Sequence, residues 1–364
     1  MTWIAISDKK HKLFNPKGLS QATTPAAGDL DAHDATMPSG SILMETRLSP
    51  EDRPQLLLGL DGGLSRDVNF SIRAVPGGGI ALVHSMGAYL CHGAINLSAE
   101  ARTDILRITY SWDMAHRWAR LSVERPETGH SDQIILKDPL PVSLLDIREM
   151  VLNPAQGAMA ADVCFLAVSD CIEPIGPMPG LTAQTPIATA YGTKWAKDIK
   201  RGDLLETLDG ASVPVLQVVR RTVPARGLFE PVRLRTPYFG LKCDVTMSST
   251  QRLVIGGSRV EYLFNAEQVL VPARHLINHT AALPVRDAAL VTYLQFLLPD
   301  HEAINAAGTY VETLDIGRIR RRPNLLRSSL LGQFERNMLP VHNKTAYPVL
   351  GSFEALILAE QRAA

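Results

Sequence analysis

Short runs in which apolar and polar residues alternate dominate the chain from Ser41 to about residue 140. They include SILMETRL, NFSIRAV, IALVHSM and DILRITYSW, separated by clusters of Gly, Pro, Asp and Asn at roughly 8 to 12 residue intervals. A period of two is typical of strands that bury one face. The pattern predicts an antiparallel β-sandwich over residues 41–140, with a jelly-roll, laminin-G-like layout.

Two tryptophans lie in adjacent predicted strands of this sandwich, Trp112 before and Trp118 after the turn-like segment Asp113–His116. Aromatic side chains at strand spacing either fill a core or stack on a sugar ring at an exposed sheet face. Aromatic residues at strand spacing usually belong to the core, which is the favoured interpretation here; the alternative is that Trp112 and Trp118 form a ligand face of the sandwich for a glycan or a protein.

The segments on either side of the sandwich have a different character. Residues 1–40 are predicted to be a mobile N-terminal arm, because the stretch from Asn15 onward is rich in Pro, Gly, Ala, Thr, Asp and His without periodicity. Residues 141–179 are predicted to be a connector. It consists of an amphipathic helix capped by Ser143, a buried strand VCFLAVS and the Pro/Gly-rich junction EPIGPMPG.

Short strands return after the junction, so the whole chain is predicted to be mainly β. The runs are ATAYG, DLLETLDG, VPVLQVVRRTV, PVRLRT, DVTMS, RLVIGG, VEYLF and VTYLQFLL. Leu208–Gly210 and Ile255–Gly257 are expected to form hairpin turns. Residues 321–364 are expected to form C-terminal helices, over about 323–338 and 353–362.

Size and charge limit what the protein can be. A chain of 364 residues exceeds the roughly 250 to 300 residues that one hydrophobic core usually serves, so two domains are expected. Lys plus Arg and Asp plus Glu each total 37, and this balance argues against broad capture of nucleic acid. No apolar run is long enough to span a membrane and no conventional signal opens the chain. We expect a soluble protein, either cytoplasmic or exported by a route without such a signal.

Neither a metal nor a cofactor is expected. The four cysteines lack C-x-x-C spacing, and the adjacent residues Asp300, His301 and Glu302 point apart in a strand or loop. The basic run Arg318 to Arg322 has no interleaved aromatic residues, so we interpret it as a solvated connector that pairs with Glu312 or Asp315.

Three segments together resemble the Hint family of hedgehog and intein autoprocessing domains, in its bacterial branch. They are TPIATAYGTKWAKDIKRGDLLETLDG, which runs from Thr185 to Gly210, then DVTMSSTQRLVI, and LVPARHLIN. The resemblance implies a horseshoe-shaped β domain over residues 180–320. In such domains a first Cys or Ser attacks the peptide bond before it, and a Thr-x-x-His motif activates that bond.

The same resemblance places Gly180 at the nucleophile and Ser248 and Gln251 at the ends of the Thr-x-x-His motif. Glycine has no attacking atom, and a glutamine amide does not exchange a proton near neutral pH. No catalytic residues are therefore expected. By position in the family, Thr182, His275 and His301 are candidates to line a polar pocket.

Three functional readings stay open at this point. The leading one is a Hint-domain protein with a degenerate autoprocessing site and a binding or structural role, without enzymatic activity. The second is an active self-cleaving module in which Thr182 or Cys171 replaces the nucleophile and the N-terminal domain is released. The third is a carbohydrate-binding sandwich on a Hint platform.

Overall fold

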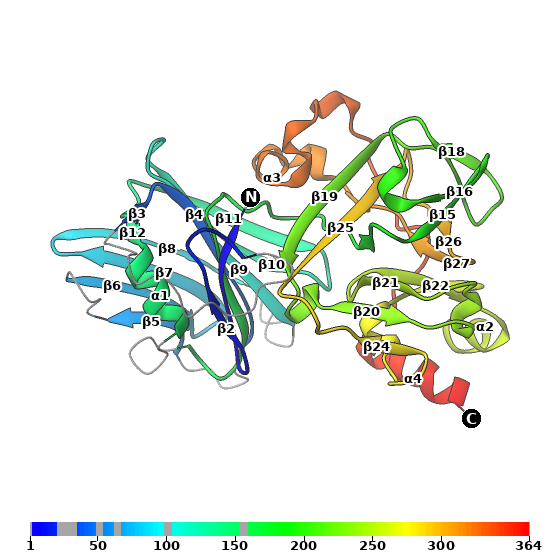
Figure 1. Ribbon diagram of the computed structural model, residues 1–364, viewed down its shortest axis with the longest axis horizontal. Coiled ribbons are helices and arrows are strands. Elements are labelled where there is room, and N and C mark those ends of the chain that lie inside the picture. Colours follow the sequence, from blue (N-terminus) through cyan, green and yellow to red (C-terminus); the bar gives the residue numbers. More distant parts are fainter. Residues whose placement is uncertain are drawn as a thin grey trace. The chain divides into compact units, whose positions relative to one another are not determined.

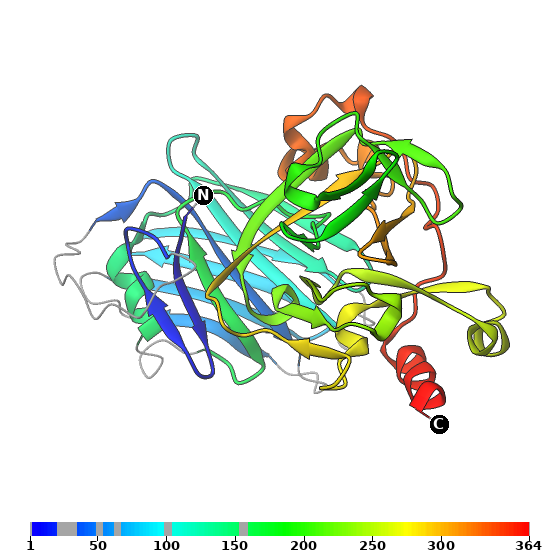
Figure 2. The same ribbon diagram turned by 45° about the vertical axis from the view of Figure 1, so that its right-hand side comes forward.

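Antiparallel sheets build both halves of the chain (Figures 1 and 2). The computed structural model describes residues 2–19, 35–48, 54–61, 67–97, 104–152 and 159–363. The chain divides into two units, Met1–Gly176 and Pro177–Ala364, and the division falls inside the predicted Pro/Gly-rich junction.

The described residues of the first unit form the following strands and helix. They are β1 (Trp3–Asp8), β2 (Lys12–Phe14), β3 (Thr36–Met37), β4 (Ser39–Arg47), β5 (Gln55–Asp61), β6 (Val68–Val75), β7 (Gly79–Met86), β8 (Tyr89–Ile95), β9 (Ile105–Asp113), β10 (Trp118–Arg125), β11 (His130–Lys137), β12 (Val142–Ser143), α1 (Leu144–Leu152) and β13 (Val163–Ser169).

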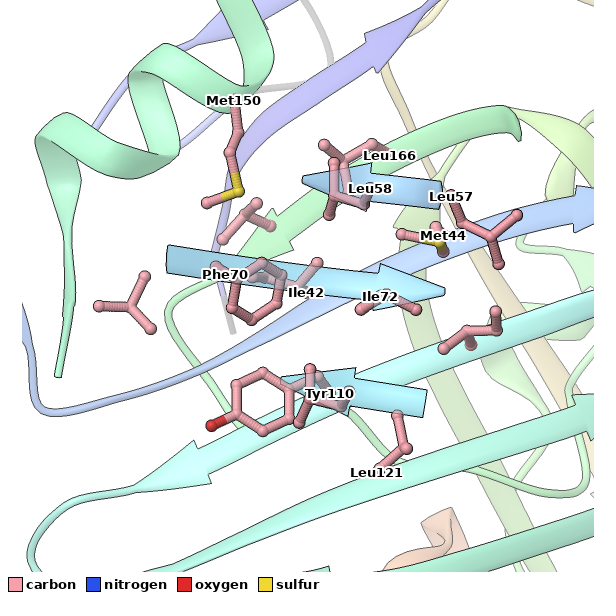
Figure 3. Packing of buried hydrophobic residues seen from close by; sticks show 14 of the residues in the cluster. Ile42, Met44, Leu57, Leu58, Phe70, Ile72, Tyr110, Leu121, Met150 and Leu166 are labelled. Atoms are coloured by element: carbon pink, nitrogen blue, oxygen red, sulfur yellow. The ribbon is translucent and has the colours of Figure 1, made fainter. Parts of the chain in front are cut away.

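These strands form a β-sandwich, as the alternating pattern predicts. One sheet has the order β11-β10-β9-β4-β13-β1-β2 and the other the order β5-β6-β7-β8. Side chains from both sheets meet in one buried cluster, where Phe70 and Ile72 of the smaller sheet face Ile42 and Tyr110 of the larger (Figure 3). Met150 of α1 also packs into this cluster.

Helix α1 begins where the sequence predicts. The Ser143 hydroxyl accepts a hydrogen bond from the Asp146 N–H at 3.0 Å, which satisfies one donor of the first turn. Ile147 and Val151, one turn apart, are fully buried. The helix therefore covers part of the sandwich core with its apolar stripe.

Two boundaries of the first unit differ from the expectation. Residues 3–14 are not part of a mobile arm, because β1 pairs with β13 inside the large sheet and Trp3 is buried. Strand β13 and α1, expected in a connector, belong to the sandwich. The local sequence does not reveal that β1 pairs with β13, since the two strands lie some 160 residues apart. The Pro- and Ala-rich part of the expected arm, residues 20–34, lies outside the described residues.

The second unit consists of short strands, short helices and 3₁₀ turns. Its strands are β14 (Leu181–Thr182), β15 (Pro186–Thr189), β16 (Gly192–Trp195), β17 (Leu204–Glu206), β18 (Ser212–Pro214), β19 (Gln217–Pro224), β20 (Pro231–Leu234), β21 (Val245–Ser248), β22 (Arg252–Gly256), β23 (Gln268–Pro272), β24 (Ala282–Pro284), β25 (Leu290–Leu297), β26 (Ala303–Ala306) and β27 (Thr309–Glu312). Its helices are α2 (Ser258–Phe264), α3 (Pro323–Ser328) and α4 (Ser352–Ala363), with 3₁₀ turns η2 (Ala196–Asp198), η3 (Gly227–Phe229), η4 (Tyr238–Gly240), η5 (Ala273–Leu276), η6 (Ile319–Arg321), η7 (Leu330–Gln333) and η8 (Arg336–Met338).

Two sheets organise this unit. One has the order β19-β25-β14-β21-β20-β24, and the other the order β18-β17-β15-β26-β27-β22-β23 with β16 beside β15. A shared core joins them, and a smaller core forms under η6, α3 and η7 around Leu314, Ile319, Leu326 and Leu331. The short strand β14 lies between β25 and β21, so the chain enters the unit through the middle of a sheet.

Three expected elements of this unit differ from the structure. VEYLF is not a strand, and Ile255–Gly257 is not a hairpin turn, because helix α2 connects β22 to β23. Gly257 precedes this helix with φ of 115°, and Asn265 ends it in the left-handed conformation. The helix expected over 323–338 stops at Ser328, where the Ser329 hydroxyl accepts from the Leu331 N–H and starts a new turn.

Among the described residues, the helices are all too short or too polar to cross a bilayer.

Candidate functional site

The entrance to the second unit is held by backbone hydrogen bonds at Gly180. The Gly180 carbonyl accepts from the Ser248 N–H at 2.7 Å, and the next residue, Leu181, is fully buried between β21 and β25. The peptide bond before Gly180 is therefore fixed next to the turn that contains Ser248 to Gln251. The structure brings these sequence-matched positions together.

The Gln251 side chain fills the space beside Gly180. A Cβ atom built on Gly180 would overlap Oε1 of Gln251 and lie 3.0 Å from its Cβ. Gly180 has no left-handed φ, so its backbone alone does not demand glycine. Residue 180 can have no side chain here because the Gln251 side chain occupies that space.

Hydrogen bonds fix the Gln251 amide on both sides. Its Nε2 donates to the Glu312 carbonyl at 3.0 Å, and its Oε1 accepts from Nε2 of Gln295 at 2.9 Å. Gln295 also donates to the Glu312 carbonyl, at 2.9 Å. The Gln251 and Gln295 side chains are both buried, so moving Gln251 would take its amide away from these partners inside the protein, away from water.

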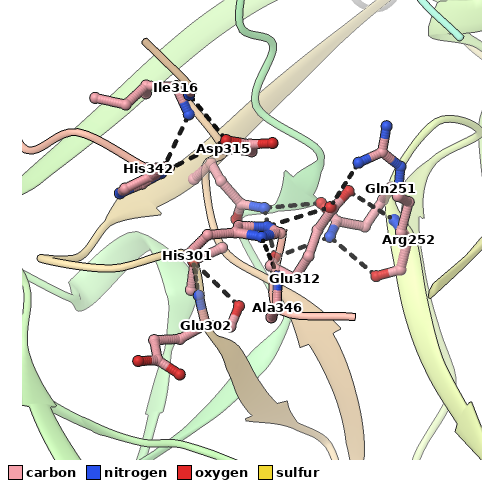
Figure 4. A network of polar contacts seen from close by, with 12 residues as sticks. Gln251, Arg252, His301, Glu302, Glu312, Asp315, Ile316, His342 and Ala346 are labelled. Atoms are coloured by element: carbon pink, nitrogen blue, oxygen red, sulfur yellow. Dashed lines mark hydrogen bonds and ion pairs between the residues drawn. The ribbon is translucent and has the colours of Figure 1, made fainter. Parts of the chain in front are cut away.

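An ionic cluster continues from this amide network at the Glu312 side chain (Figure 4). The carboxylate lies 3.1 Å from Nη1 of Arg252 and 3.4 Å from Nε2 of His301. Nδ1 of His301 accepts from the Ala346 N–H at 3.0 Å, so in the neutral ring the proton lies on Nε2 and faces Glu312. The His301 side chain is fully buried. His301 therefore anchors the segment around Ala346.

The three candidate pocket residues lie on different elements: Thr182 on β14, His275 on η5 and His301 between β25 and β26. Thr182 donates its hydroxyl to the Thr246 carbonyl at 2.7 Å, within its own sheet. His275 lies on η5, which is tied to the same turn by a hydrogen bond from the Arg274 N–H to the Ser249 carbonyl. Burial, reinforced by the Arg274 charge, lowers the pKa of His275 to about 4. His275 is thus neutral near pH 7.

Cys171, the other alternative nucleophile, belongs to the first unit. Burial and the neighbouring Asp170 carboxylate, 3.0 Å from its sulfur, raise the pKa of this thiol. A higher pKa leaves less thiolate, which is the attacking form. This environment opposes nucleophilic activation of Cys171.

Trp112 does not belong to an exposed ligand face. It is fully buried, and its indole N–H donates to the Met37 carbonyl at 3.2 Å. Trp118 is half-buried and lies on the opposite face of the sheet, because Trp112 pairs with Ala119 whereas Trp118 pairs with Asp113. The expectation of a joint tryptophan face is wrong. The two rings belong to neighbouring residue pairs of the ladder, and side chains of neighbouring pairs point to opposite faces of a sheet.

Sequence reasoning missed Gln295 altogether, and it missed the contacts of Glu312 with Gln251, Gln295, Arg252 and His301. The available signal was the glutamine in the largely apolar run VTYLQFLL, since a buried glutamine requires hydrogen-bond partners. Nothing local indicates that its partner is Gln251, 44 residues away.

Gly180, Ser248 and Gln251 all belong to a segment that matches a known protein family. Residues 179–318 match the family model described as Hint domain. The protein carries a Hint domain. No curated protein matches the chain.

Comparison with solved structures finds partial matches. The MchDnaB-1 intein (N145AA) is 15% identical, and the match covers 37% of this chain and 99% of the intein, with a TM-score of 0.27. The Ruminococcus gnavus IT-sialidase CBM40 bound to alpha2,3 sialyllactose is 13% identical, with 36% of this chain and 63% of that chain covered and a TM-score of 0.22. The sialyllactose is a ligand of that protein.

Proposed function

We propose that the Hint domain of this protein has lost self-cleavage and serves as a rigid binding or structural module. The observation that carries the proposal is the packing of the Gln251 side chain into the space next to Gly180. An acyl shift needs an attacking side-chain atom at this position and a group that protonates the leaving nitrogen. Gly180 lacks the first, and the Gln251 amide does not supply the second.

The surroundings of the site support the same proposal. The Thr182 hydroxyl is engaged by the Thr246 carbonyl, and the Cys171 thiol is disfavoured as a thiolate. The fixed amides of Gln251 and Gln295 join β22, β25 and β27 through buried hydrogen bonds. Buried amide hydrogen bonds of this kind contribute rigidity rather than proton transfer.

Intact mass spectrometry of the purified protein tests the proposal directly. The chain should stay one species of 39.7 kDa during incubation with a thiol or with hydroxylamine. Two fragments that meet between Pro179 and Gly180, or directly before Thr182 or Cys171, would overturn the proposal and establish the self-cleaving alternative. Cleavage at any other position that an inhibitor series abolishes would identify a contaminating protease.

A matched variant shows whether the two missing groups are the cause. In Gly180→Cys with Gln251→His, the Cys thiolate can attack the Pro179 carbonyl carbon. The amide nitrogen then leaves as the protonated amine of residue 180, and a thioester remains. Hydroxylamine would convert that thioester into a hydroxamate on Pro179 and release residues 1–179. We expect cleavage in this double variant and in neither single variant.

A further inference from the structure

An arginine-rich segment follows the Hint match in the second unit. Residues 318–338 contain six arginines, no lysine and a single acidic residue, Glu335. Arg318, Arg321, Arg322 and Arg327 are exposed, and Arg320 is half-buried. We call these five residues the arginine cluster.

The carboxylates expected to neutralise the cluster are engaged elsewhere. Glu312 faces Arg252 and His301, while Asp315 accepts from the Gly317 N–H at 2.9 Å and lies 3.6 Å from Nδ1 of His342. Within the described part of the chain, no acidic group forms an ion pair with any member of the cluster. The expectation that these arginines pair with Glu312 or Asp315 is wrong.

Hydrogen bonds and apolar packing hold the backbone of the arginine cluster in place, so the charged side chains stay close together. The Arg321 N–H donates to the Arg318 carbonyl at 2.9 Å, and the Leu326 N–H donates to the Arg322 carbonyl at 2.9 Å. Beneath them, Ile319 and Leu326 pack into the small apolar core. In a 3₁₀ turn, residues three apart lie on one side, which places Arg318 and Arg321 next to each other.

Uncompensated like charges held this close repel one another, and an anionic partner would remove that cost. The two units also differ in charge. Residues 1–176 contain 15 basic and 21 acidic side chains, whereas residues 177–364 contain 22 and 16. The overall neutrality of the chain therefore hides a basic second unit, with its densest positive charge at the arginine cluster.

We propose that the arginine cluster is a binding surface for an acidic polysaccharide that bears carboxylate or sulfate groups. The guanidinium fork matches these planar or tetrahedral anions through paired hydrogen bonds, and all the basic residues of the segment are arginines.

Other anionic partners fit less well. Single-stranded nucleic acid would require exposed aromatic rings for stacking, but Phe334, the one aromatic residue of the segment, packs against the apolar core. A membrane surface would require several large apolar side chains among the arginines, and of these Met338 alone is strongly exposed, at the far end of the segment. The inference goes beyond the proposed function, because self-cleavage would leave the cluster unchanged.

Heparin affinity chromatography of the full-length protein tests the inference. The wild-type chain should be retained at about 0.15 M NaCl. The variant Arg318→Ser, Arg321→Ser, Arg322→Ser should elute at lower salt, with about tenfold weaker binding to immobilised heparin. A matched control, Arg201→Ser, Arg233→Ser, Arg259→Ser, removes equal charge from exposed sites of the same unit and should elute with the wild type.

The outcomes separate a local site from general attraction. Flow-through of the wild type, or identical elution of the two triple variants, would overturn the inference. Polygalacturonate, duplex DNA and vesicles of phosphatidylcholine with phosphatidylglycerol serve as competitors; stronger competition by DNA or vesicles than by polygalacturonate would overturn the assignment to a polysaccharide. Circular dichroism checks folding, and the single exposed change Arg321→Glu carries the same test if the triple variant unfolds.

Discussion

The fit between Gly180 and Gln251 makes Gly180→Ala an informative perturbation. The added Cβ overlaps Oε1 of Gln251 and comes within 3.0 Å of its Cβ, so the glutamine side chain must move. Because the two amide contacts of Gln251 have lengths of 2.9 and 3.0 Å and are buried, this movement breaks both. A methyl group at residue 180 should therefore loosen the network that includes Gln295.

The size of the effect follows from those two contacts. Leaving a buried donor or acceptor without a partner costs about 1 to 3 kcal/mol each. Gly→Ala gains about 0.4 to 1 kcal/mol from the unfolded chain, since φ of Gly180 is not left-handed. The net expectation is a second unit destabilised by about 2 kcal/mol, which corresponds to hydrogen exchange about thirtyfold faster in its core strands.

Hydrogen exchange measured by mass spectrometry resolves the two units within one chain. Peptides from β14 and β25 should lose protection in Gly180→Ala, while sandwich peptides should not change. Gly351→Ala is the control, because that glycine has no left-handed φ and its added Cβ would meet only Oε2 of Glu354, at 3.7 Å. In a Gln251→Ala background, the cost of Gly180→Ala should shrink.

Additivity would refute this reasoning. If Gly180→Ala costs the same with alanine as with glutamine at residue 251, the two side-chain positions are not coupled. Unchanged exchange in Gly180→Ala with the native Gln251 would show that the network accommodates a methyl group without losing its hydrogen bonds.

Three further perturbations concern the sandwich. Burial lowers the folded-state pKa of His84 to about 4. The free energy of unfolding should therefore fall by about 3 kcal/mol between about pH 6.5 and pH 4. Chemical denaturation across this range should show the loss, and His84→Phe should make the free energy of unfolding less dependent on pH. Glu45→Ala leaves Arg107, whose Nε and Nη2 lie 3.0 and 2.8 Å from Oε1 of Glu45, without this carboxylate. It should cost about 3 kcal/mol in urea unfolding, whereas Asp138→Ala, in an exposed ion pair, should cost less than about 1. Ser143→Ala should lower stability by about 1 kcal/mol through loss of the α1 cap, and Ser143→Asp should restore it; no change in the melting curve of the alanine variant would contradict the cap.

Much of the fold could be predicted because it depends on neighbours in sequence. Alternation with period two indicates the sandwich strands, and the predicted cap at Ser143 is confirmed. The prediction of a strand at Val260–Phe264 was wrong because the local pattern there does not distinguish a strand from a helix. Short apolar runs fit a strand or a helix equally well, and only the conformations of Gly257 and Asn265 at the ends of α2 distinguish them.

The chain by itself determined that residue 180 has no side chain and that residue 251 does not titrate near neutral pH, since both are properties of the amino acids. Only the tertiary structure decided that these residues touch, that Gln295 and the Glu312 carbonyl hold the amide between them, and that Trp112 faces the core. The physical reason is that burial and hydrogen-bond pairing depend on residues that lie 44 to 71 positions apart in the sequence and meet only in the fold, whereas chemical identity and local conformational preference do not.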